Sequence, residues 1–99
     1  MKLTNNQKKY LRSMAHDLKP FVMIGQHGLS DSVVNELEST LLKHELLKIK
    51  LRVSDRKEKQ QIVDKIILLS KAVLVQVIGG VLVIYRPFED TPNIILPRK

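Results

Sequence analysis

Leu47-Lys48-Ile49-Lys50-Leu51-Arg52-Val53 is the stretch of sequence that decides the fold. Apolar and cationic residues alternate in it with a period of two, which is typical of a strand that turns one face toward a core. The three cations on the other face would stand about 7 Å apart, because a strand rises roughly 3.3 Å per residue. If that face is open, the row suits successive phosphates. The alternative is an ordinary solvated sheet face.

A strand, a glycine turn and a helix precede this stretch. The apolar run 21–24 lies between Pro20 and Gly25, which indicates a short buried strand. Gly25-Gln26-His27-Gly28 is expected to form a turn, and Ser30 is a good N-cap for a helix that closes near His44 and Glu45. The expected buried stripe of this helix is Leu29, Val33, Val34, Leu37, Leu41 and Leu42.

The N-terminal segment predicts another helix. Thr4 followed by Gln7 is a capping-box signal, and Lys19-Pro20 is expected to end the helix because a residue before proline avoids helical geometry. The expected buried stripe is Leu3, Tyr10, Leu11, Met14 and Leu18.

Downstream, Asp55 and Glu58 predict a third helix through a second capping box. Its expected apolar stripe is Ile62, Val63, Ile66, Ile67 and Leu69. Residues 72–78 and 81–85 are typical strands, and Gly79-Gly80 between them is a two-residue hairpin signal. Residues 88–99 are expected to be an irregular tail.

The predicted element order is helix, strand, helix, strand, helix, strand, strand. Each of the two strand–helix–strand units implies a parallel crossover, whereas the final hairpin is antiparallel. The sequence therefore predicts one α/β domain over residues 1–99, built on a mixed sheet.

Composition narrows the classes of function. The 99 residues carry a formal charge of +7 and no cysteine, which favours polyanionic partners and excludes disulfides and thiolate catalysis. No apolar run approaches the roughly 18 residues of a membrane span, and the N-terminus has no signal-peptide core. We therefore expect a cytoplasmic protein with no membrane partner.

The charge is segregated along the chain. Residues 1–28 carry five Lys or Arg and one Asp, and residues 48–71 carry eight Lys or Arg and three acids. Between them, residues 29–47 carry one Lys and four acids. Such segregation predicts a directional basic face rather than an evenly solubilised surface.

The Gly25–Gly28 turn is the strongest local motif. Glycines permit close approach of the backbone to a ligand, and the N-terminus of the following helix favours phosphate. A G-x-x-G loop clamps the RNA backbone in KH domains. The same spacing also occurs in ordinary strand-to-helix turns. Most of the support for a phosphate-binding role therefore comes from the basic segments on either side of the loop.

Catalytic and metal-binding patterns are missing from the sequence. The histidines, His16, His27 and His44, match no metal-ligand spacing, and Ser30 and Ser54 are better explained as helix-start residues than as nucleophiles. We therefore expect no cofactor, no metal and no enzymatic activity. Four scattered aromatics also disfavour base stacking on an RRM-like sheet.

Several segments line up, in order, with one known family. They are Ala15–Pro20, Gly25–Leu29, His44–Lys50, Val75–Arg86 and Leu96–Lys99. On these segments the chain resembles the bacterial YhbY-type proteins, stand-alone members of the CRM (chloroplast RNA splicing and ribosome maturation) domain family. Relatives commonly place Thr-Gly after the third helix, whereas Ser70-Lys71 stands here, so this helix must end without the usual glycine.

The resemblance implies a fold similar to the C-terminal domain of translation initiation factor three. It also implies RNA binding through the glycine loop and its basic surroundings, and action on ribosomal RNA in precursors of the large ribosomal subunit. We separately expect the protein to be a monomer. Ribosomal proteins are further candidate partners, through the acidic second helix. The candidate RNA-binding residues are Arg12, Lys19, Gly25, Gln26, His27, Gly28, Lys48, Lys50, Arg52 and Arg86.

Two other functions stay open at this point. A double-stranded DNA-binding protein would need a recognition helix, and the third helix offers Arg56, Lys57, Gln60 and Gln61. A small hydrolase or nuclease would need carboxylates or histidines gathered by the fold.

Overall fold

The computed structural model describes residues 1–99 and contains three helices and four strands in the predicted order. The elements are α1 (Asn5–His16), β1 (Val22–Ile24), α2 (Asp31–Leu41), β2 (Leu46–Leu51), α3 (Arg56–Ser70), β3 (Val73–Ile78) and β4 (Val81–Tyr85). The predicted α/β class is confirmed.

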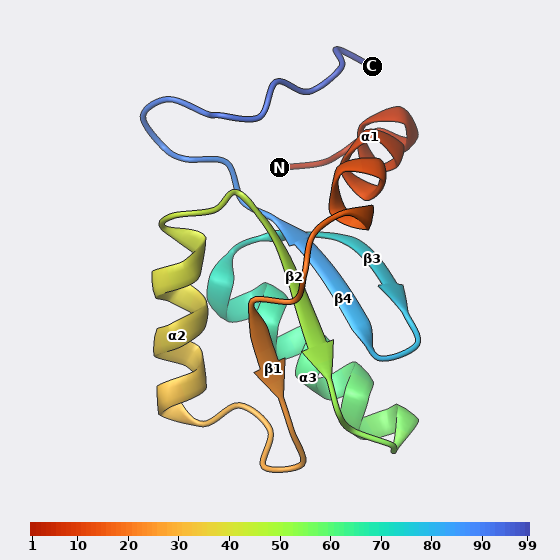
Figure 1. The fold of residues 1–99 in the computed structure, drawn as a ribbon, viewed down its shortest axis with the longest axis vertical. Coiled ribbons are helices and arrows are strands. Elements are labelled where there is room, and N and C mark those ends of the chain that lie inside the picture. Colours follow the sequence, from red (N-terminus) through yellow and green to blue (C-terminus); the bar gives the residue numbers. More distant parts are fainter.

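The four strands form one mixed sheet in the order β1-β2-β4-β3 (Figure 1). β1 and β2 are parallel, whereas β4 is antiparallel to both of its neighbours, β2 and β3. β3 is therefore parallel to β2, with β4 inserted between them. Both strand–helix–strand units thus join parallel strands, as the sequence predicts.

Two hydrophobic cores lie on opposite faces of the sheet. On one face α2 and α3 pack over the larger core, whose strand residues are Val22, Ile24, Leu47, Ile49, Leu51, Leu82 and Ile84. On the other face α1 packs over a smaller core around Leu11, Ala15, Leu46, Val83 and Tyr85. The period-two pattern of β2 produces this division, because alternate side chains point to opposite faces.

Local capping fixes where each helix begins. The Thr4 hydroxyl accepts from the Gln7 N–H at 3.2 Å, and the Gln7 side chain accepts from the Thr4 N–H at 2.9 Å. Ser30 caps α2 through the Val33 N–H, and Asp55 caps α3 through the Glu58 N–H. All three predicted helix starts are confirmed, although the predicted capping box at Asp55 and Glu58 forms only one of its two hydrogen bonds.

The predicted buried stripes are too wide. Tyr10, Met14, Leu42 and Leu69 are exposed, because each helix contacts the sheet along a narrow line. The strand at 21–24 is only half buried: β1 is a three-residue edge strand, and Met23 on its outer face is 55% exposed. α1 also ends at His16, before the Lys19-Pro20 stop.

The tail forms no helix or strand, yet it is packed against the domain. Ile94 and Leu96 pack against the smaller core, and the Gln7 side chain donates to the Pro97 carbonyl at 2.8 Å. The buried carboxylate of Glu45 accepts from three backbone N–H groups, those of Phe88, Asn93 and Ile94. The sequence assigned Glu45 to the end of a helix and gave no sign of this contact.

Lys71 closes α3 in a left-handed conformation with φ 59°, its N–H donating to the Ile67 carbonyl. A left-handed conformation costs a non-glycine residue roughly 1–2 kcal/mol. Glycine avoids this cost, but its greater conformational entropy in the unfolded state offsets part of the gain. We therefore expect Lys71→Gly to raise the free energy of unfolding by about 0.5–1 kcal/mol in denaturant titrations. The matched change Lys65→Gly, in the exposed interior of α3, should lower it by about 1 kcal/mol. A loss of stability in Lys71→Gly would contradict the strain argument.

Candidate nucleic-acid interface

The Gly25–Gly28 loop joins the end of β1 to the start of α2, at the lower end of the molecule in Figure 1. The Gly28 N–H donates to the Gly25 carbonyl at 3.0 Å, and Gly28 adopts φ +70°, which favours glycine. A Cβ built on either glycine meets no heavy atom within 4 Å. Gln26 and His27 are exposed between them. The loop backbone is therefore open to a ligand.

The first turn of α2 follows this loop directly. Backbone N–H groups at a helix N-terminus favour anions, but Asp31 occupies this first turn and opposes that attraction. The loop needs additional cations to hold a polyanion.

The parallel pairing of β1 with β2 supplies such cations. Lys50 pairs with Met23, and the Arg52 N–H donates to the Ile24 carbonyl at 2.7 Å, immediately before the loop. Both cationic side chains are exposed. The start of α3 adds Lys59, whose ammonium lies 3.3 Å from the Gly79 carbonyl of the β3–β4 hairpin. These groups and the glycine loop share one end of the sheet.

Lys48 has a different environment, although it belongs to the same period-two row. Its ammonium donates to the carbonyls of Ala15 and Leu18, at 3.0 and 3.1 Å, where α1 ends. α1 therefore covers the sheet face at Lys48 and leaves it open at Lys50. The predicted row of three cations is divided by this contact, and two of them face solvent.

Comparison with known proteins identifies the family. The sequence profile of the CRS1 / YhbY (CRM) domain matches residues 3–86. This chain belongs to the CRM domain family. The resemblance seen in the sequence is confirmed.

Similar proteins come from several bacteria. A Haemophilus influenzae protein named an RNA-binding protein is 46% identical over 97 residues, covering 98% of this chain and 97% of that protein. A Pseudomonas aeruginosa protein named a probable RNA-binding protein is 40% identical, covering 94% of this chain and 88% of that protein. The solution structure of a Staphylococcus aureus protein, described as a candidate RNA-binding protein, superposes with a TM-score of 0.82 at 34% identity, covering 97% of this chain and all of the other.

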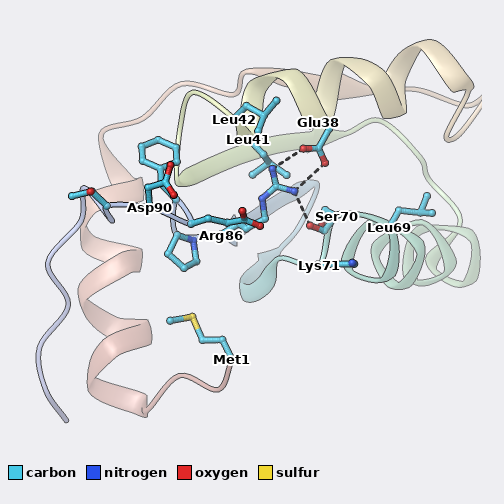
Figure 2. Close-up of a pocket in the computed structure, with 13 residues that line it drawn as sticks. Met1, Glu38, Leu41, Leu42, Leu69, Ser70, Lys71, Arg86 and Asp90 are labelled. Carbon is cyan, nitrogen blue, oxygen red and sulfur yellow. Dashed lines mark hydrogen bonds and ion pairs between the residues drawn. The ribbon is translucent and has the colours of Figure 1, made fainter.

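Arg86, the last residue of the CRM match, lies away from the glycine loop. Its guanidinium forms a two-pronged ion pair with Glu38, at 2.7 and 3.0 Å, and donates to the Ser70 carbonyl at 2.9 Å (Figure 2). The hydrogen bonds from Arg86 lower the pKa of the Glu38 carboxyl, and the same pairing raises the pKa of Arg86. Arg86 therefore joins α2 to the end of α3.

A depression of about 1020 Å³ surrounds that ion pair. Its lining includes Leu42, Leu69, Glu89 and Asp90 (Figure 2). Its three carboxylates, Glu38, Glu89 and Asp90, outnumber its two cations, Lys71 and Arg86, so it is a poor site for a polyanion. None of the glycine-loop residues lines it, so the depression and the glycine loop are separate features.

The remaining predicted residues lie on the α1 side of the domain. Arg12 on α1 and Lys19 after it are both exposed. Nearby in sequence, the Phe21 ring stacks on His44 with centroids 4.5 Å apart, and both side chains are exposed. Sequence reasoning missed this aromatic pair, because no periodicity links two residues 23 positions apart.

The CRM domain gathers no three His, Asp or Glu side chains into a group able to hold a metal ion. Its helices are also too short or too polar to cross a membrane.

Proposed function

We propose that this protein binds RNA through the Gly25–Gly28 loop together with Lys50 and Arg52, and that it acts without catalysis. One observation carries the proposal: parallel pairing of β1 and β2 brings an open glycine loop and two exposed cations to the same end of the sheet. A G-x-x-G loop beside basic side chains suits an RNA backbone. The names of the CRM relatives support RNA as the polyanion.

We further propose that the RNA is ribosomal and that the protein, as a cytoplasmic monomer, assists assembly of the large ribosomal subunit. This part rests on the likeness to YhbY-type proteins. With few aromatics, such a protein would read RNA shape and phosphates, and its binding would depend strongly on salt.

The test is a set of titrations at several salt concentrations. The unmodified protein is titrated with fragments of large-subunit precursor RNA, with unrelated RNA of equal length, and with duplex DNA. Tighter binding to the precursor fragments supports the proposal. Equal binding to all three would reduce it to a non-specific basic protein, and preference for DNA would favour the exposed Arg56 and Lys57 of α3 as a recognition surface.

Lys48 and Lys50 provide a matched pair of variants on one strand. Lys50→Gln should lower the slope of log K against log salt by about one while changing stability by less than about 0.5 kcal/mol. Lys48→Gln should lower the free energy of unfolding by about 1–3 kcal/mol, because two charged hydrogen bonds to the end of α1 are lost. Its salt slope should stay unchanged. Equal salt slopes in the two variants would contradict the assignment of Lys50 to the interface.

A further inference from the structure

Four side chains form a row across the part of the sheet that α1 leaves uncovered. Met23 pairs with Lys50, Lys50 pairs with Val81, and Val81 pairs with Ile78. Directly paired residues project from the same face of a sheet, so these four form one row across all four strands, which we call the strand row. Lys48, two residues before Lys50, places this face on the α1 side.

The strand row is exposed and largely apolar. Met23 is 55% exposed and Ile78 is 65% exposed, with Lys50 exposed and Val81 half-buried between them. Val83, the next residue of β4 on this face, is 2% exposed, because α1 covers it. The end of the sheet that carries the strand row lies below α1 in Figure 1. α1 therefore covers the row that contains Lys48 and Val83 but not the next row, which contains Lys50 and Val81.

The strand row is adjacent to the proposed phosphate site. Met23 lies two residues before Gly25, and Ile78 directly precedes the Gly79-Gly80 hairpin, where the Lys59 ammonium lies. Arg52 continues the strand that carries Lys50. An apolar surface is therefore bordered by the glycine loop and by cations, with Lys50 inside it.

We propose that the strand row receives the unpaired bases of single-stranded RNA. This inference rests on the proposed RNA binding and specifies which form of RNA is bound. In a duplex the bases are paired and stacked, and the helix offers mainly phosphates and 2′-hydroxyls, which do not cover apolar side chains. Unpaired bases have open faces and edges, which can contact Met23 and Ile78 and accept hydrogen bonds from Lys50.

The dimensions and charge of the strand row suit this occupant. Four strands spaced about 4.8 Å apart give a row about 14 Å wide. Four-stranded sheets of RRM domains hold two or three bases through aromatic side chains. Aliphatic side chains replace the aromatics here, and the bordering cations favour an anionic strand over an apolar protein segment.

The test compares an unstructured RNA with an RNA duplex that carries the same number of phosphates. The variant Met23→Thr/Ile78→Thr removes apolar contact area and keeps residues that favour strands. We expect it to weaken single-strand binding about tenfold, at the lower end of losses at aromatic platforms, with duplex binding and the salt slope unchanged. The matched control Leu68→Thr, at an α3 side chain that is 77% exposed, should change neither.

Other outcomes separate this inference from the proposed function. Equal losses for single strand and duplex, or no loss at all, would overturn the strand row as a base site and leave RNA binding intact. If the unmodified protein bound no RNA, both would fail. If it sedimented as a dimer and the Thr variant as a monomer, the strand row would be a self-association surface instead.

Discussion

Placing aspartate at both Gly25 and Gly28 is expected to weaken RNA binding about a hundredfold. Each carboxylate brings a negative charge to backbone that would lie against phosphate, and a loss of about 1.4 kcal/mol at each position multiplies to that factor. The fold should survive. A Cβ on either glycine meets open space, and aspartate is among the residues that tolerate the left-handed φ of Gly28. Fluorescence anisotropy with the preferred RNA fragment measures the effect, and thermal melts check folding.

Two single variants separate charge from position. Gly25→Ala adds a methyl group without charge in open space, so we expect it to retain most of the affinity. Ser39→Asp adds one negative charge near the far end of α2, on an exposed side chain, and should weaken binding only slightly. If Ser39→Asp weakened binding as much as Gly25→Asp alone, net charge would explain the result and the loop would have no special role.

The sequence predicts those parts of the fold that local patterns encode. The alternation around β2 reports directly which side chains are buried, and Leu47, Ile49 and Leu51 are buried as expected. Helix starts depend on residues three positions apart, and a two-residue hairpin depends on its own glycines. The strand pairing follows, because short connections leave few ways to join these elements.

What the sequence does not reveal are contacts between distant segments. Lys48 and Lys50 are equivalent in the period-two pattern, and only the position of α1, 33 residues before Lys48 at Ala15, makes them different. The partner of Arg86 likewise lies 48 residues away, at Glu38. How much of a sheet face a helix covers depends on tertiary packing. The sequence therefore identifies candidate cations, but it does not distinguish a cation that stabilises the fold from one that is free to bind a ligand.

Glu45→Ala is expected to have the largest effect on stability. The Glu45 side chain is 3% exposed, and its carboxylate accepts N–H groups of Phe88, Asn93 and Ile94 at 2.6–2.9 Å. Each such bond to a charged group contributes about 1.5–3 kcal/mol. The full sum is not lost, because a released tail can hydrate its N–H groups. The cost is then limited to the free energy of docking the tail, and we expect a loss of about 2–4 kcal/mol in denaturant titrations.

This limit on the cost is itself testable. In a chain shortened to residues 1–87, Glu45 has lost all three donors, so Glu45→Ala should cost far less there than in the full chain. Hydrogen exchange at the Ile94 amide should rise in full-length Glu45→Ala well before the amides of β4 become labile. A similar loss in both chains would contradict the limit and would mean that Glu45 stabilises the sheet independently of the tail. Residues 88–99 lie beyond the CRM match, which ends at residue 86. Glu45 holds this tail in place, and the tail in turn packs against the smaller core and hydrogen-bonds to Gln7 of α1. The position of α1 decides which strand cations are open, so the tail contributes to the arrangement of the proposed interface.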